Sequence, residues 1–180
     1  MTDDVRDRKP SVRARWTEWF AWGAYSLGTV LMGGVALEST VYVPNWVYGV
    51  PASLDATRAF LAARNPGSFF QIVAPLLIVV SLVAAGLAWR HRPVRNALLG
   101  GLLLLLVSEA MTFVLVYPRM RRLLVEDVAQ RPLAELEAAA HALMLWGFWL
   151  RLLLMGSAVF GFYLYAARAS TLERHATPRP

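Results

Sequence analysis

Residues 31–46 of the chain read LMGGVALESTVYVPNW and lie near the end of a long apolar run that starts after Trp19. In the middle of this stretch stands Glu38, with Gly34 one helical turn before it and Tyr42 one turn after it. A carboxylate inside a membrane span costs about 2.5–3.5 kcal/mol on insertion scales, and such residues pair with one another or mark a functional site. The rest of the chain is therefore expected to supply partners for Glu38.

The composition indicates a membrane protein. The chain has 180 residues, of which 57% are hydrophobic, and a mean hydropathy of +0.46. These values exceed those of an ordinary soluble domain, so the lipid bilayer is the expected solvent. The chain has no cysteine, which excludes disulfides and thiolate catalysis. The net charge of +6 comes from basic residues that flank apolar runs, so nucleic acid is not an expected partner.

Four apolar segments predict an all-α fold, a transmembrane four-helix bundle with a short helix in an outer loop. The predicted spans are residues 19–43, 69–89, 96–117 and 138–167. Residues 1–15 are expected to form a disordered tail, residues 16–168 the membrane domain and residues 169–180 a polar C-terminal tail. Pro44 and Pro118 are expected to end the first and third apolar runs.

The first outer loop, residues 45–68, contains the candidate for the short helix. Ser53 is the expected N-cap of this helix. Leu54, Phe60 and Leu61 would place its apolar face either on the membrane surface or over the mouth of the bundle as a lid.

The distribution of lysine and arginine predicts the orientation. Eleven of them lie in the two tails, counting Arg168 at the end of the last span, and in the turn at residues 90–95, against six in the two opposite loops. This excess predicts that both termini are cytoplasmic. The first span is too long for a cleavable signal peptide and is expected to remain as an anchor. The arginine-rich, alanine- and leucine-rich composition favours a bacterial protein, so the predicted location is the inner membrane.

Counting along each span from its cytoplasmic end at 1.5 Å per residue places four polar residues in one layer. Glu38 and Gln71 lie about 28 Å up, Arg151 about 24 Å and Glu109 about 21 Å. Two carboxylates and one guanidinium in hydrocarbon must face inward and meet, so Arg151 is expected to pair with Glu38, Glu109 or both. If both acids are ionised the layer carries a charge of −1, and a proton or a cation is expected to balance it.

Two roles are compatible with this layer. It can be a structural ion-pair network that specifies how the helices pack. Alternatively, it can be a polar pocket that opens outward beneath aromatic side chains, where Glu38, Glu109 and Arg151 are catalytic. In this second interpretation the substrate-binding residues are Gln71, Tyr42, Trp46, Trp146 and Trp149.

A metal site receives less support from the sequence. Glu137 and His141 are four residues apart and share a helical face, and they are ligand types of a carboxylate–imidazole site. A second Glu-x-x-His pair is missing, and a solvated histidine or an interfacial ion pair explains the spacing better. No metal is therefore predicted, and the cofactor is left open.

Several short strings resemble a known family. They are Tyr42-Val43-Pro44-Asn45-Trp46, Pro51-Ala52-Ser53-Leu54, Phe70-Gln71, Thr112…Tyr117-Pro118 and Trp146…Trp149…Arg151. Together they resemble the anthrone-oxygenase-like four-span integral membrane proteins, a largely uncharacterised family, over about residues 33–167. The resemblance implies that Glu38, Gln71, Glu109 and Arg151 are the first candidates for a site.

Two functions remain open from the sequence. The first is a membrane enzyme, oxygenase-like, acting on a small lipophilic or phenolic ligand, where Glu38 or Glu109 accepts a proton and Arg151 holds a developing oxyanion. The alternative is a non-enzymatic accessory or structural subunit with a membrane-protein partner, which the small size and the glycines of the first span favour. A proton conduit is disfavoured because residues 98–106 in the inner half are almost all apolar.

Overall fold

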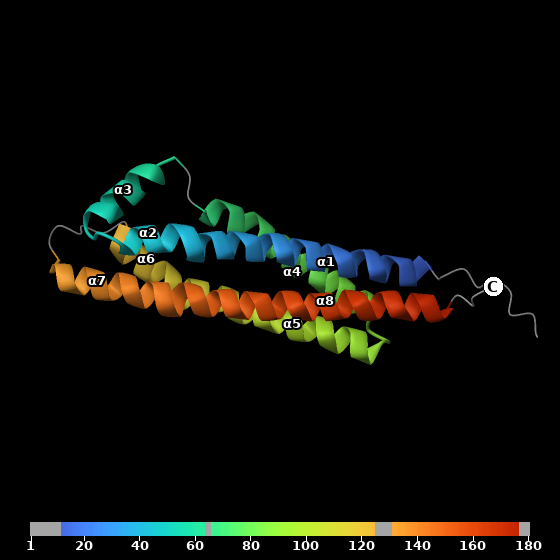
Figure 1. The fold of residues 1–180 in the computed structure, drawn as a ribbon. Coiled ribbons are helices and arrows are strands. Elements are labelled where there is room, and N and C mark those ends of the chain that lie inside the picture. Colours follow the sequence, from blue (N-terminus) through green and yellow to red (C-terminus); the bar gives the residue numbers. More distant parts are fainter. Residues whose placement is uncertain (1–11, 64–65, 125–130, 177–180) are drawn as a thin grey trace, which may run out of the picture.

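The computed structural model describes residues 12–63, 66–124 and 131–176. Every regular element in these ranges is a helix, which confirms the predicted all-α class. Four helical segments are long and apolar enough to cross a membrane, as the sequence predicts: Val12–Val47, Gly67–Leu87, Arg92–Leu124 and Leu133–Arg168. The chain is thus a multi-pass integral membrane protein in contact with the lipid bilayer (Figure 1).

Three of the four spans are interrupted by a π-helical segment. The first span consists of α1 (Val12–Leu37), η1 (Glu38–Tyr42) and α2 (Val43–Val47), and the second is α4 (Gly67–Leu87). The third consists of α5 (Arg92–Met111), η2 (Thr112–Val116) and α6 (Tyr117–Leu124). The fourth consists of α7 (Leu133–Ala142), η3 (Leu143–Trp149) and α8 (Leu150–Ala176), and α3 (Ala52–Phe60) lies between the first two spans.

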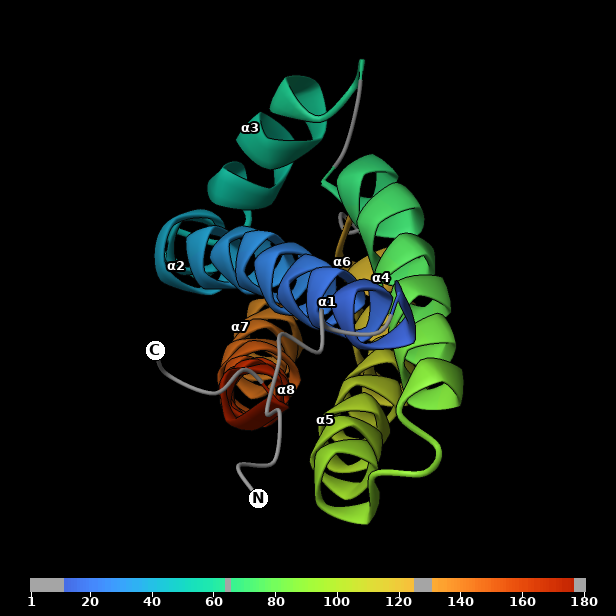
Figure 2. The ribbon, with the colours of Figure 1, turned by 90° about the vertical axis from the view of Figure 1, so that its right-hand side faces the viewer.

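The long helices pack as a bundle whose two ends differ. α8 packs along both α1 and α5, whereas α4 packs mainly on α1 (Figure 2). The first residue of α1 and the last of α8 lie at one end of the bundle, here called the termini end. α3, α6 and α7 lie at the opposite end, here called the loop end.

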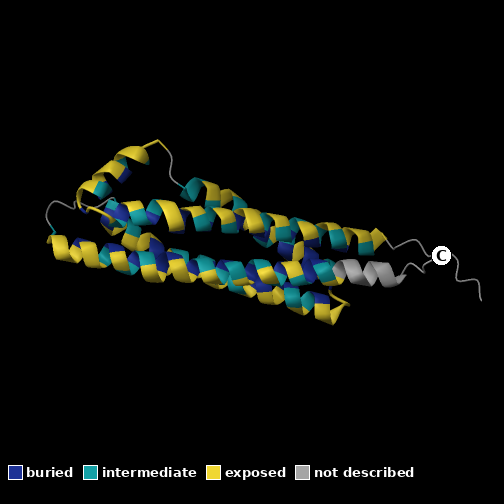
Figure 3. Cartoon of the chain, viewed as in Figure 1, coloured by how far each residue is buried: buried dark blue, intermediate teal, exposed yellow. Residues whose placement is uncertain are grey.

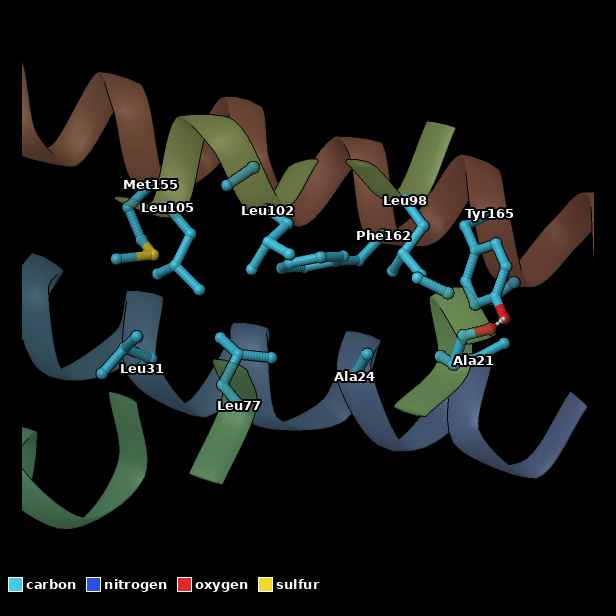
Figure 4. Packing of buried hydrophobic residues seen from close by; sticks show 14 of the residues in the cluster. Ala21, Ala24, Leu31, Leu77, Leu98, Leu102, Leu105, Met155, Phe162 and Tyr165 are labelled. Carbon is cyan, nitrogen blue, oxygen red and sulfur yellow. Dashed lines mark hydrogen bonds between the residues drawn. The ribbon is translucent and has the colours of Figure 1, made fainter. Parts of the chain in front are cut away.

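Two apolar clusters fill the interior. The termini-end cluster joins α1, α4, α5 and α8 through residues such as Leu31, Leu105 and Met155 (Figure 4). The loop-end cluster joins α2, α3, η2, α6, α7 and η3 through residues such as Trp46 and Phe148. Large apolar side chains are also exposed on the outside of every span, where they face lipid. Figure 3 shows how exposed positions run along each long helix.

Side chains from neighbouring helices hold the carbonyl groups left free at helix ends. At the termini end, Arg13 Nε donates to the Leu87 carbonyl at 3.0 Å, and the Tyr165 hydroxyl donates to the Ala84 carbonyl at 3.4 Å (Figure 4). At the loop end, Arg58 Nε donates to the Leu124 carbonyl at 2.8 Å and its Nη2 to the Leu123 carbonyl at 3.0 Å. The carbonyls of Leu87, Leu123 and Leu124 are the last of their helices and have no donor one turn ahead. The Ala84 carbonyl also accepts from the Ala88 N–H at 2.9 Å, so the Tyr165 hydroxyl is its second donor.

Several element ends differ from the sequence expectation. The first helix begins at Val12, so part of the predicted tail is helical, and residues 1–11 lie outside the described ranges. The helix continues past Pro44 to Val47, and past Pro118 to Leu124. In both cases a π turn ends two residues before the proline and absorbs the change in hydrogen bonding that its missing N–H causes.

The short outer helix is present, and it covers the loop end of the bundle. Leu54 is buried in the loop-end cluster, while Phe60 stays largely exposed. Ser53 is not its N-cap: the preceding flanking residue is Pro51, and the Ser53 hydroxyl donates to the Trp46 carbonyl at 2.7 Å. This hydrogen bond instead joins the start of α3 to the end of the first span.

Candidate functional site: a buried arginine–carboxylate layer

Three charged side chains meet between the two apolar clusters. Arg151 Nη1 donates to Glu38 Oε2 at 3.2 Å, and Arg151 Nη2 lies 4.0 Å from Glu109 Oε1. The side chains are 2%, 6% and 15% exposed for Arg151, Glu38 and Glu109 respectively. The convergence predicted by counting depth along the spans is therefore found, with one guanidinium between two carboxylates.

The π turns lie next to these three residues. Glu38 is the first residue of η1, Glu109 comes shortly before η2, and Arg151 comes directly after the residue that follows η3. The Val43 N–H donates to the Glu38 carbonyl, five residues back, and the Tyr117 N–H donates to the Thr112 carbonyl in the same way. π turns inside α-helices occur frequently at functional sites.

The second span contributes to the layer through an aromatic ring. The guanidinium carbon of Arg151 lies 4.7 Å from the centroid of the Phe70 ring, which is a cation–π contact. The first span leaves room for this ring, because a Cβ on Gly34 would lie 2.6 Å from Phe69 Cε1 and 3.3 Å from Phe70 Cε1. Phe70 was not among the predicted site residues. The sequence feature that points to it is Gly34, because a glycine one turn before Glu38 leaves space for a ring from a neighbouring helix.

Several buried polar atoms at the layer make no hydrogen bond within the described chain. They are Arg151 Nε, Arg151 Nη2, Glu109 Oε1 and Ser108 Oγ. An arginine has five N–H donors arranged in a planar fork, and only one nitrogen of Arg151 is used by Glu38. Buried polar groups left without a partner are costly, so this part of the layer is suited to receive the oxygen atom of a small molecule.

The predicted substrate-binding residues do not gather around the layer. Tyr42 is half-buried and its ring lies 6.2 Å from that of Phe60 in α3. Trp46 is buried edge-on against the ring of Phe148 at 6.0 Å. Both aromatic residues therefore belong to the loop-end cluster, which closes the side of the layer that was predicted to open outward.

Gln71, Trp146 and Trp149 face away from the layer. Gln71 is exposed because its neighbour Phe70 occupies the face of α4 toward Arg151. Trp146 and Trp149 are 62% and 41% exposed. Their indoles point outward because Arg151, a few residues along the same span, takes the inward face.

The Glu137–His141 pair stays apart from this layer. Both residues are exposed on α7. Among the described residues no three His, Asp or Glu side chains gather in a way that could hold a metal ion. The groups that do converge are a guanidinium and two carboxylates.

Comparisons with known proteins do not assign this chain to a family. No protein-family model, no curated protein and no solved structure matches this chain. The site is accordingly interpreted from its geometry.

Proposed function

We propose that this membrane protein is an enzyme that binds a small lipophilic molecule at the Glu38–Glu109–Arg151 layer through an acidic oxygen. The observation that carries the proposal is the Arg151 guanidinium, which is enclosed between two carboxylates while its Nε and Nη2 make no hydrogen bond within the described chain. An oxyanion is the ligand that such donors favour in a site shielded from water. A molecule that reaches this depth must dissolve in the bilayer, which favours a lipophilic body.

The arrangement favours proton transfer to Glu109. Glu38 Oε2 already accepts a hydrogen bond from Arg151, whereas Glu109 Oε1 has no hydrogen-bond partner in the described chain. In the proposed step the O–H bond of a phenolic substrate breaks, and its proton forms an O–H bond with the Glu109 carboxylate. The electron pair stays on the substrate oxygen, where Arg151 donates to it, while Glu38 holds Arg151 in place.

The resemblance to anthrone-oxygenase-like proteins favours an oxidation after this step, with dioxygen as co-substrate. A ring methylene would then lose two hydrogens and gain one oxygen atom as a carbonyl, and the second oxygen atom would leave as water. The deprotonated ring is the electron-rich species that dioxygen oxidises. A bacterial inner membrane with both termini in the cytoplasm is the proposed location. The arginine-, alanine- and leucine-rich composition supports the bacterial origin, and the lysine and arginine distribution supports the orientation.

The test is dioxygen consumption by the purified full-length protein with anthrone as the probe. Replacing the proposed base, Glu109→Gln, is expected to lower turnover by at least about 100-fold, the low end of what general-base catalysis contributes. Glu38→Gln is expected to lower it as well, because Arg151 loses its charged partner. Glu137→Gln, an exposed acid on α7, is the matched control and is expected to leave turnover unchanged.

Three results would each contradict a different part of the proposed function. Unchanged turnover in Glu109→Gln would remove this residue from the mechanism. Absence of dioxygen consumption by the wild-type protein would overturn the oxygenase assignment. Binding of 1-naphthol that is equally tight in the wild-type protein and in Arg151→Gln would overturn the site itself.

A non-enzymatic accessory subunit is the second candidate. It is favoured by the buried ion pair in which Arg151 Nη1 lies 3.2 Å from Glu38 Oε2, because this pair alone can join the first and fourth spans. Purification from its native membrane in mild detergent tests this candidate. An accessory subunit is expected to co-purify in fixed stoichiometry with a partner, and a solitary protein contradicts it.

A further inference from the structure

A groove on the side of the bundle lies between the third and fourth spans, outside the arginine–carboxylate layer. Its volume is about 240 Å³, and its walls are Leu115, Arg119, Ala142, Trp146, Gly147 and Leu150. Arg119 is the one charged residue among these walls, and both Arg119 and Trp146 are exposed. All of these residues lie within the two helical segments that are long and apolar enough to span a membrane, so the bilayer is the expected source of an occupant.

The groove is polar at one end and apolar along its length. The third and fourth spans run antiparallel, and Gly147 packs against Val116 so closely that an added Cβ would lie 3.2 Å from Val116 Cγ2. Arg119 lies one turn nearer the loop end than Leu115. Leu150 lies two turns from Ala142 toward the termini end. The cation is therefore at the loop end, and the apolar wall extends toward the middle of the membrane.

Arg119 retains most of its capacity to bind an anion. Its Nη1 donates to the Leu115 carbonyl at 3.0 Å, which holds the side chain along its own helix and over the groove. This is its only hydrogen bond within the described part of the chain. A guanidinium has five N–H donors in a fork that matches the oxygens of a phosphate group.

We propose that this groove binds one phospholipid with an anionic headgroup, its phosphate on Arg119 and one acyl chain along Trp146 and Leu150. The direction of the groove matches that of a lipid in this leaflet, with the charge outward and the chain toward the bilayer centre. The volume is below the about 300–1,000 Å³ of sites for drug-sized ligands, which suits part of a single chain. An anionic headgroup is favoured over a zwitterionic one because the groove walls offer Arg119 no carboxylate.

Native mass spectrometry of the full-length protein tests this binding, with phosphatidylglycerol and phosphatidylcholine present in equal amounts. The wild-type protein is expected to retain one phosphatidylglycerol in preference to phosphatidylcholine. Arg119→Gln is expected to reduce this retention about fivefold, the factor for one arginine near an anionic membrane surface. Arg121→Gln is the matched control: this residue is an exposed arginine on the same helix but does not line the groove, and retention is expected to stay unchanged.

A second variant tests the chain-binding part without touching the charge. Ala142→Phe fills the groove and is expected to lower phosphatidylglycerol retention while leaving Arg119 in place. Equal retention of the two lipids by the wild-type protein, or equal losses in Arg119→Gln and Arg121→Gln, would overturn the proposal. Displacement of the lipid by glycerol 3-phosphate, which has no acyl chain, would likewise contradict a lipid site and favour a soluble phosphate.

Discussion

Arg151 is enclosed by the side chains of Glu38, Glu109 and Phe70, one from each of the other three spans. Moving a charged group out of water costs several kcal/mol per ion, and close pairing is what offsets this cost. The ring of Phe70 adds a cation–π contact of about 0.5–2 kcal/mol. A single residue of the last span therefore touches all other spans, and the position of each span along the bundle depends on it.

The close contact at Gly34 is testable with its neighbour as the control. Gly34→Ala would place a Cβ 2.6 Å from the Phe69 ring, so we expect a loss of about 1–3 kcal/mol in unfolding free energy through overpacking. Gly33→Ala meets nothing within 4 Å and is expected to be neutral or slightly stabilising. Unfolding of the detergent-solubilised protein by SDS measures both, and equal effects would contradict the packing described.

The sequence predicts well how deep the polar residues lie in the membrane, but it predicts poorly which way their side chains point. The rise of a helix is nearly constant, so Glu38, Glu109 and Arg151 could be placed in one layer by counting. Which way a side chain points depends on the rotation of each helix, and a π turn changes that rotation without leaving a clear signal in sequence. Trp146, predicted to face the layer, lies within η3 and faces outward for this reason. Gln71 lies on α4, which has no π turn, and faces outward because Phe70 takes the inward face.

At the scale of elements, each of the three interrupted spans has its π turn next to the polar layer. η1 and η2 each end two residues before a proline, Pro44 and Pro118, and η3 contains Gly147. The prolines are visible in the sequence and were expected to end the helices. Because the wide turn accommodates the missing N–H, the helix instead continues and carries α2 and α6 into the loop-end cluster.

One arginine, Arg58, joins the outer helix α3 to the end of α6. Arg58 donates to the last two carbonyls of α6 and also pairs with Asp55 at 3.0 Å. We expect Arg58→Ala to destabilise the loop end by about 1.5–3 kcal/mol, since hydrogen bonds from a charged donor are lost, and to speed amide hydrogen exchange in α3. Asp55→Ala removes only an exposed ion pair and is expected to cost less than about 1 kcal/mol. Similar exchange rates in the two variants would show that Arg58 does not hold α3.

At the scale of the whole molecule, the bundle is two apolar clusters with the charged layer between them. Glu38 lies between Val35 of the termini-end cluster and Val43 of the loop-end cluster, and Arg151 lies between Met155 and Phe148 in the same way. The four-span class could be predicted from hydropathy because a membrane span needs about 20 apolar residues. The division into two clusters could not, since apolar residues cover the lipid-facing side as well.

The absence of cysteine makes the membrane topology directly measurable. Single cysteines introduced as Thr2→Cys and Thr171→Cys are expected to react with a membrane-impermeant maleimide from the same side. The two termini share a side because an even number of spans returns the chain to its starting side. Ala63→Cys, in the loop after α3, is expected to react from the opposite side, because one span separates it from the N-terminus. Cytoplasmic labelling of Ala63→Cys would reverse the predicted orientation, and labelling of all three from one side would contradict four spans.

The central claim is that Arg151 and Glu38 form a buried ion pair that joins the spans, and a double-mutant cycle in unfolding free energy tests it most directly. The cycle compares Glu38→Gln, Arg151→Gln and the double variant in detergent micelles. We expect a coupling energy of about 1.5 kcal/mol or more, as found for close charge pairs in desolvated surroundings. Effects that add to within about 0.5 kcal/mol, as they do for distant independent sites, would contradict it.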